Sequence, residues 1–199
     1  MAYIANTMFE TKVTNAVFDE TLNITGRYQA SSADADCSAG LLCVRGDNLP
    51  NEGYNGINNM SINNMNAYYM TAAAATDLDN IFACNTFDIQ TAVTARGNVY
   101  KIGAETLGLG IPAGMNGTFT KIVFDGNKIY RFGAGNLSAA PSTNTYFTIA
   151  NGLLVPAAAA PKAGTPYFKL VDSGVATEGA YASMTYYDVL ACRDVVVAS

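Results

Sequence analysis

The residues of this chain whose type and spacing best suit metal binding or catalysis are paired carboxylates. Asp34 and Asp36 form one Asp-x-Asp pair, and Asp77 and Asp79 form another. Such pairs offer the hard oxygen ligands that calcium prefers, but neither lies in the twelve-residue, Glu-terminated loop of a helix–loop–helix calcium site. We therefore expect both pairs to be solvated carboxylates in turns, and the sequence predicts no metal site.

Glycoside hydrolysis is a second use for two carboxylates, which must then lie about 5–10 Å apart across a cleft. Glu105 with Asp125 and Asp172 with Glu178 are candidate pairs, but their spacing along the chain gives no reason to place them that close. The chain also has no histidine, which removes the commonest general base, metal ligand and triad member. The sequence predicts a protein that is not an enzyme, with no catalytic residue and no cofactor. A carboxylate-based cell-wall hydrolase stays as an alternative.

The tripeptide Arg45-Gly46-Asp47 is one that integrin ligands use. It follows the apolar residues 42–44, and Gly46, Asp47 and Asn48 are the residue types that a turn requires. The sequence therefore predicts the end of a strand and its turn, and the triplet is no evidence of adhesion.

The four cysteines are Cys37, Cys43, Cys84 and Cys192. They form no Cys-x-x-Cys motif and have no histidine companions, which argues against zinc. Their apolar neighbours are typical of buried, reduced thiols, and the N-terminal residues lack the basic and long apolar regions of a secretory signal. We expect four reduced thiols, with a disulfide such as Cys37–Cys43 as the alternative.

Composition narrows the class of partner. Half of the residues are hydrophobic and 14% are charged, below the roughly 25% of an ordinary soluble domain. The net charge of -5 and the absence of clustered Lys and Arg argue against nucleic acid. No apolar run approaches the roughly 20 residues that span a bilayer. We expect neither nucleic acid nor membrane as a partner, and the charge-poor, Asn- and Thr-rich surface favours close contact with other protein subunits.

Short runs of β-branched and aromatic residues, bounded by Gly, Pro, Asn and Asp, recur along the chain. In the clearest case, residues 118–124 and 128–132 flank Asp125-Gly126-Asn127, which predicts a β-hairpin. No segment shows sustained helical spacing of apolar residues, so the sequence predicts an all-β protein with less than about 15% helix.

Two stretches of the chain echo each other. "AGLLCV" and "NGLLVP" both carry Gly-Leu-Leu, and each is followed by an aromatic pair and then by Ala-Cys. This echo predicts two small related β modules, sandwich- or barrel-like, in which residues 39–84 superpose on 151–192. Leu42 would then match Leu154, and chance similarity among apolar strands is the alternative. The predicted divisions are an N-terminal arm with the first strand (1–27), module one (28–95), a β-hairpin region (96–133) and module two (134–199).

The order of these motifs resembles the small decoration, or cement, proteins on the capsids of tailed bacteriophages. In that family, Ala-Gly and two aliphatic residues follow a short acidic turn, and an aromatic strand with an Ala-rich continuation leads to an aliphatic strand. Here the corresponding stretches are "DADCSAGLLCV" and "NAYYMTAAAATDLDNIFACN". The resemblance covers residues 28–95, and residues 140–199 more loosely.

This resemblance implies a structural protein of the virion, made in the host bacterial cytoplasm. It would bind the major capsid protein on the outer surface of the assembled capsid and stabilise the shell. Neighbouring copies of itself are a second partner, with a trimer as one arrangement. The family has no catalytic residues to carry over. A phage tail or receptor-binding module is the alternative.

The segment "MAYIANTMF" is predicted to form part of the capsid contact. Its apolar Tyr3, Ile4 and Phe9 stand among polar residues, where a short arm would lie along a neighbouring subunit. The alternative is that these three side chains pack on the core of their own chain.

Overall fold

The structure, a computed structural model, describes residues 4–12, 23–49, 67–77, 80–85, 91–93, 99–101, 110–141, 146–162, 164–177 and 183–193. Nearly all regular structure in these ranges is β-strand, and the helical part is the single 3-10 turn η3 (Ala134–Asn136). The predicted all-β fold class with little helix is therefore confirmed. Within these ranges, no helix combines the length and the apolar character that crossing a membrane requires.

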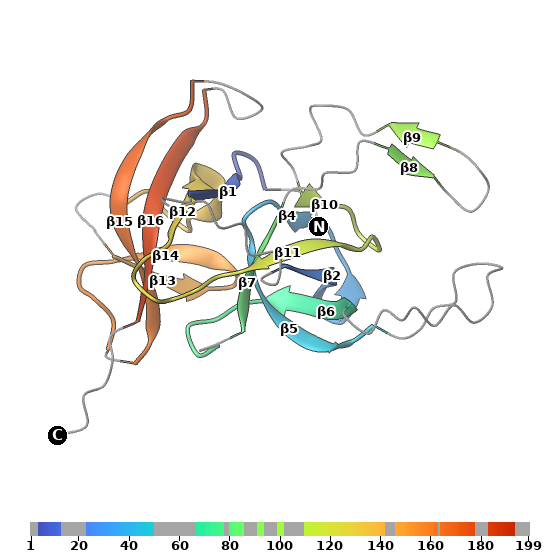
Figure 1. Cartoon of the computed structure of the whole chain (residues 1–199), viewed down its shortest axis with the longest axis horizontal. Helices are drawn as coiled ribbons and strands as arrows, with labels where there is room; N and C mark the ends of the chain where they lie inside the picture. The colour runs from blue at the N-terminus through green and yellow to red at the C-terminus, as the bar shows by residue number, and fades with distance from the viewer. Residues whose placement is uncertain are drawn as a thin grey trace.

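Five strands close into a small barrel (Figure 1). Around the barrel they run in the order β11 (Gly117–Lys121), β7 (Ile81–Cys84), β5 (Leu42–Asn48), β6 (Ala67–Ala72) and β2 (Asn23–Ala30), and β11 pairs again with β2. Adjacent strands are antiparallel except β2 and β6. Closure removes the exposed strand edges that an open sheet of this size would have.

Shorter strands complete this half of the molecule. β3 (Ala33–Asp34) folds back on β2. β4 (Cys37–Ser38) pairs with β10 (Gly110–Ile111), which places the side chain of Ile111 in the apolar core of the barrel. β8 (Thr91–Val93) and β9 (Val99–Lys101) form a separate two-stranded pair.

Six further strands form an antiparallel sheet beside the barrel (Figure 1). Their order is β1 (Phe9–Lys12), β12 (Ile129–Gly133), β16 (Thr185–Arg193), β15 (Pro166–Val175), β13 (Tyr146–Ala150) and β14 (Leu153–Ala157). Strands β15 and β16 are the longest in the sheet and project past their neighbours in Figure 1. We call residues 171–177 and 183–187, which include the projecting ends of these two strands, the β15–β16 arm.

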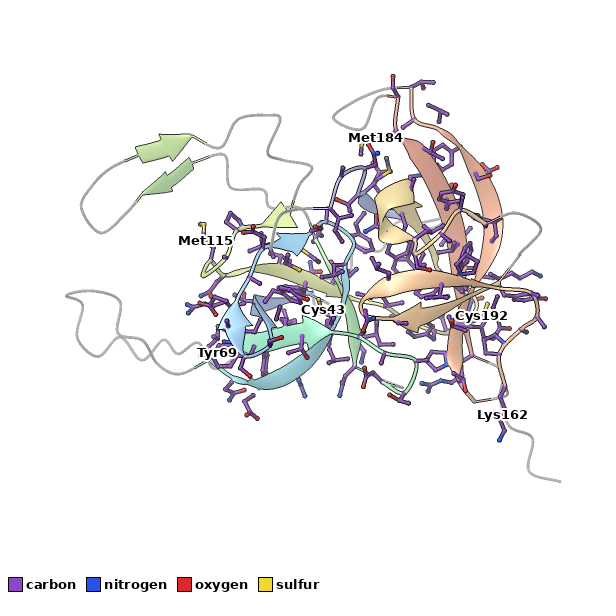
Figure 2. The ribbon with its side chains drawn as sticks, turned by 180° about the vertical axis from the view of Figure 1, so that it is seen from behind. Cys43, Tyr69, Met115, Lys162, Met184 and Cys192 are labelled. Carbon is purple, nitrogen blue, oxygen red and sulfur yellow. The ribbon has the colours of Figure 1, made fainter. Side chains whose placement is uncertain are left out.

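Two strands of the barrel, β5 and β7, contribute side chains to both apolar cores. Alternate side chains of a strand point to opposite faces, and both faces are buried along β7 and at the start of β5. Leu42, Ile81 and Ala83 face the sheet and join its core. Cys43, labelled in Figure 2, and Cys84 face the interior of the barrel. Burial on both faces explains why these strands read as continuous apolar runs.

The predicted hairpin of residues 118–132 is wrong. β11 pairs with β2 and β7 of the barrel, whereas β12 pairs with β1 and β16 of the sheet. The turn itself is present, because Asp125 Oδ1 accepts a hydrogen bond of 2.9 Å from the Asn127 N–H. Phe119 belongs to the barrel core and Phe132 to the core beneath the sheet. The part of the predicted hairpin region 96–133 that β11 and β12 occupy is therefore not a separate hairpin, since the chain crosses from one body to the other at this turn.

The predicted internal repeat is also wrong. Gly40 and Gly152 both have positive φ, 71° and 75°, and Leu42 and Leu154 lie in the same core. However, β5 lies between β6 and β7 after Gly40, while β14, after Gly152, is an outermost strand that pairs with β13. The Gly-Leu-Leu motif requires only a left-handed turn residue followed by a buried strand, and this need arises in unrelated topologies.

All four cysteines are reduced thiols in the structure, as predicted. Cys37, Cys43 and Cys84 lie together in the barrel core, whereas Cys192, in the sheet (Figure 2), is partly exposed. Burial raises the pKa of the Cys37 and Cys43 thiols. Because the thiolate is the reactive form, this burial makes both side chains slow to react.

We expect a thiol-alkylating reagent at pH 8 to label Cys192 first and the three barrel cysteines only after unfolding. Peptide mass spectrometry of native and denatured samples measures each site. Fewer than four alkylated cysteines after denaturation without reductant would contradict the reduced state.

Candidate interaction surface

The N-terminal segment, residues 4–12, crosses the junction between barrel and sheet. At one end the Ile4 N–H donates to the Ser38 Oγ of the barrel at 2.9 Å. At the other end β1 pairs with β12, and Phe9 packs against the rings of Tyr130 and Phe132 at centroid distances of 6.1 and 5.6 Å. The segment therefore joins the two bodies through both backbone and side-chain contacts.

The side chain of Asn136 forms a hydrogen bond with the backbone at the middle of this segment. Its side-chain Oδ1 accepts hydrogen bonds from the Met8 N–H at 2.9 Å and the Gly133 N–H at 3.0 Å. Its Nδ2 donates to the Ala39 carbonyl at 2.7 Å. The side chain is fully enclosed, so one amide satisfies three backbone groups of the segment, the sheet and the barrel.

Gly133 and Gly135 allow the backbone of the N-terminal segment to lie close to that of β12 and η3. A Cβ on Gly135 would overlap the carbonyl oxygen of Ala5, and a Cβ on Gly133 would overlap that of Asn6. The Gly135 N–H also donates to the Asn6 carbonyl at 2.8 Å. Glycine is required here for the close approach of two backbones.

The three residues predicted for partner contact have different positions. Tyr3 lies outside the described residues, and Ile4 is partly buried. Phe9 is only 4% exposed and belongs to the core of its own chain. Phe9 is therefore corrected from a partner contact to a core residue, because its ring is already covered by aromatic neighbours.

A pocket of about 240 Å³ opens between β1, β12 and the β15–β16 arm. The two walls come from segments distant in the sequence, which meet because β1 and β16 both pair with β12. The residues that line the pocket are Met8, Glu10, Arg131, Val175, Ala176, Thr177 and Tyr186.

Arg131 is held from several sides at this pocket. Its Nε and Nη2 donate to the two carboxylate oxygens of Asp188 at 2.7 and 2.8 Å, and its Nη1 lies 3.8 Å from Glu10 Oε2. The guanidinium stacks 3.6 Å from the ring centroid of Tyr186. Hydrogen bonding to Asp188 raises the pKa of Arg131 further. The positive charge of Arg131 is therefore already paired with carboxylates of its own chain.

The arm carries apolar surface beside the pocket. Val171 and Val175 are 53% and 57% exposed, and they are the exposed large hydrophobic side chains of the described residues. Val171 sits at a register shift in the pairing of β15 with β16. Beyond Val175 the strands stay joined, since the Ala176 N–H donates at 2.8 Å to the carbonyl of Met184, labelled in Figure 2.

The Asp-x-Asp pairs have local structural roles. The carboxylates of Asp36 and Asp77 accept hydrogen bonds from backbone N–H groups at 2.8 and 2.7 Å. Asp34 lies 3.7 Å from the guanidinium of Arg27. Asp79 lies outside the described residues. Among the residues that are described, no three metal-ligating side chains gather into a site.

In each candidate glycosidase pair, the structure describes only one of the two carboxylates. Glu105 and Glu178 lie outside the described residues. Asp125 is in the turn between β11 and β12, and Asp172 is on the arm, where it accepts a hydrogen bond of 3.3 Å from the Tyr186 hydroxyl.

The Arg45-Gly46-Asp47 triplet lies within β5, so the predicted turn is wrong. Its pairing with β6 shifts register between Arg45 and Asn48, which leaves Gly46 and Asp47 at a bulge. The strand continues because β6 provides hydrogen-bond partners past the apolar residues. Arg45 lies 4.8 Å from the ring centroid of Tyr68.

The sequence reasoning missed the group of Glu10, Arg131 and Tyr186. One signal was available, since Arg131 stands between two aromatic residues in a strand-like run and a polar residue there faces away from the core. Its partners were not recognisable, because Glu10 and Asp188 are far from it in the sequence.

Comparison of the chain with protein-family models, curated proteins and solved structures finds no significant match in any of the three.

Proposed function

We propose that this chain is a structural virion protein that binds the outer surface of an assembled phage capsid and stabilises the shell. The observation that carries the proposal is the projecting β15–β16 arm. Its two valines, Val171 and Val175, are each more than half exposed, and Val175 lines a pocket together with Met8 and Glu10 of the N-terminal segment. Exposed apolar side chains beside a hollow are a feature that protein–protein contact sites use.

The body that carries the arm supports this role. One core, to which the barrel strands β5 and β7, the sheet and Phe9 all contribute, and the amide of Asn136 join the barrel, the sheet and the N-terminal segment. Such a body presents its contact surface already ordered, so that binding costs little conformational entropy. The small charged fraction of the chain, 14%, also limits repulsion between many copies packed on one shell.

Stabilisation of the shell follows from preferential binding. A contact surface formed by neighbouring capsid subunits exists only after assembly, so the protein binds the shell better than it binds unassembled subunits. Binding to one state alone shifts the equilibrium toward that state. The major capsid protein is the proposed partner, with neighbouring copies of this chain, as in a trimer, as a further contact.

A structural role also accords with the chemistry of the described pocket. A carboxylate-based hydrolase needs one carboxylic acid kept protonated beside a second, ionised carboxylate. At the pocket, Arg131 instead binds Asp188 through two hydrogen bonds and lies 3.8 Å from Glu10, so both carboxylates face one guanidinium.

We expect the purified protein to bind assembled capsids of its phage and to bind unassembled capsid protein poorly. Co-sedimentation with each form measures the difference, and immunogold electron microscopy locates the protein on virions. Virions that lack the protein should release DNA at a lower temperature. Labelling on the tail would favour the tail or receptor-binding alternative, and clearing of cell walls by the protein would favour the hydrolase.

A matched pair of variants tests the role of the arm. Replacing both Val171 and Val175 with serine should weaken capsid binding roughly 5- to 30-fold, because about 1–2 kcal/mol of apolar burial is lost. Ala159→Ser, at an exposed position outside the arm, should leave binding unchanged. Equal binding by the double variant and the wild type would exclude the arm as the contact.

A further inference from the structure

We propose that the pocket between β1, β12 and the β15–β16 arm receives one basic side chain, a lysine or an arginine, from the partner protein. The identity of the partner as a capsid subunit rests on the proposed function. The class of side chain rests on the pocket itself. Three features of the pocket support it: size, charge and the nature of its walls.

Size favours a single side chain. The pocket volume of about 240 Å³ lies below the roughly 300 Å³ at which pockets for drug-sized ligands begin. Protein interfaces commonly concentrate their affinity in a few anchor side chains that enter well-packed hollows, surrounded by weaker contacts that exclude water. The exposed Val175 at the edge of the pocket would supply such a surrounding contact.

Charge favours a cation. Around the pocket, Glu10 and Asp188 face Arg131, and Asp172 accepts a hydrogen bond from the hydroxyl of Tyr186. Among the side chains that the structure describes here, three carboxylates face one guanidinium, which gives a local excess of negative charge. An incoming anion would meet a guanidinium that already binds Asp188 through two hydrogen bonds.

Glu10 is the group with capacity for a new partner. Its side chain is 43% exposed, and its contact with Arg131 spans 3.8 Å, longer than a hydrogen bond. An ammonium or guanidinium in the pocket would therefore gain a carboxylate oxygen without first breaking a close pair. Both oxygens of Asp188, in contrast, are already bound to Arg131.

The walls suit the stem of a basic residue. Val175 and Ala176 supply apolar surface at the pocket, and Glu10 supplies the carboxylate. Lysine and arginine bury their aliphatic stems along apolar surface and direct the charged end to a polar group. A purely apolar anchor would bury Glu10 without a new partner, which costs free energy.

The test uses Glu10→Gln, which removes the charge and nearly preserves the shape, in the full chain. We expect Glu10→Gln to bind assembled capsids roughly 5- to 30-fold more weakly than the wild type and with a smaller dependence on salt. Glu10→Lys should bind more weakly still. Asp47→Asn, at an exposed carboxylate of the barrel, should bind as the wild type does. Thermal unfolding of Glu10→Gln should stay close to the wild type, because exposed ion pairs contribute little to stability.

A second measurement separates this proposal from the proposed function. The free protein is titrated with N-acetyl-lysine methylamide and, as a control, with N-acetyl-glutamate methylamide, while NMR follows the methyl groups of Met8 and Val175. We expect shifts with the lysine compound alone, and their loss in Glu10→Gln. Such shifts without any capsid binding would support the pocket and reject the capsid partner.

Two other outcomes reject the pocket proposal. Equal capsid binding by wild type, Glu10→Gln and Glu10→Lys would overturn it while the capsid function stands. Shifts with the glutamate compound, or shifts that persist in Glu10→Gln, would show that the pocket does not select a cation through Glu10.

Discussion

Replacing Asn136 with alanine is expected to lower the free energy of unfolding by about 3–5 kcal/mol. The change removes three hydrogen bonds of the enclosed amide, and leaves the Met8 N–H and the Ala39 carbonyl buried without that partner. Each buried polar group left unsatisfied costs about 1–3 kcal/mol. The Gly133 N–H keeps a contact of 3.3 Å to the Met8 carbonyl, which limits the total.

Urea denaturation followed by far-ultraviolet circular dichroism measures this loss. Asn48→Ala, at an exposed position of β5, is the control and should change stability by no more than about 0.5 kcal/mol. Hydrogen exchange should also become faster at the amides of residues 5–9 in Asn136→Ala. A loss below about 1 kcal/mol, with exchange unchanged, would show that the amide does not hold the N-terminal segment.

Truncating one phenylalanine in each core is expected to cost about 3–5 kcal/mol per variant. Phe119 is fully buried inside the barrel, and Phe168 is fully buried beneath the sheet, where its ring lies 5.8 Å from that of Phe132. Because β5 and β7 contribute side chains to both cores, loss of either core should unfold the whole molecule. We expect one transition in both Phe119→Ala and Phe168→Ala.

Two probes test this cooperativity. Circular dichroism reports the strands, and tyrosine fluorescence is usable because the chain has 12 tyrosines and no tryptophan. The two curves should coincide in each variant, as two-state unfolding requires. Val171→Ala, at an exposed site of the arm, is the control and should have a small effect. Separate transitions in Phe168→Ala would show that the barrel folds independently of the sheet.

The sequence predicted correctly those features that depend on local pattern. Alternation of apolar residues and the turn residues between runs indicated an all-β fold. The apolar neighbours of the cysteines indicated buried, reduced thiols, which is correct for Cys37, Cys43 and Cys84, whereas Cys192 is reduced but partly exposed. The turn at Asp125-Gly126-Asn127 was also recognisable, because an Asx turn needs only its own residues. Each of these features is decided within a few residues of chain.

Strand pairing was not predictable in the same way. Alternation determines which side chains of a strand are buried, but it does not identify the neighbouring strand. β11 and β12 are adjacent in sequence and suited to a hairpin, yet β11 pairs with strands of the barrel and β12 with a strand of the sheet. Likewise, the similar Gly-Leu-Leu motifs precede a central strand in one case and an outermost strand in the other.

The candidate site depended entirely on tertiary structure. Glu10, Arg131 and Tyr186 meet because β1 and β16 flank β12 in the sheet. That strand order depends on the burial of apolar side chains from many strands, and no short sequence pattern indicates it. Phe9 is a second example. The sequence shows that its side chain is apolar, but only the folded structure shows that residues of its own chain cover it. The sequence by itself therefore determined strands, turns and thiol state, which arise from local preferences. The pocket and the projecting arm were decided by long-range packing, because only the folded chain brings distant residues together.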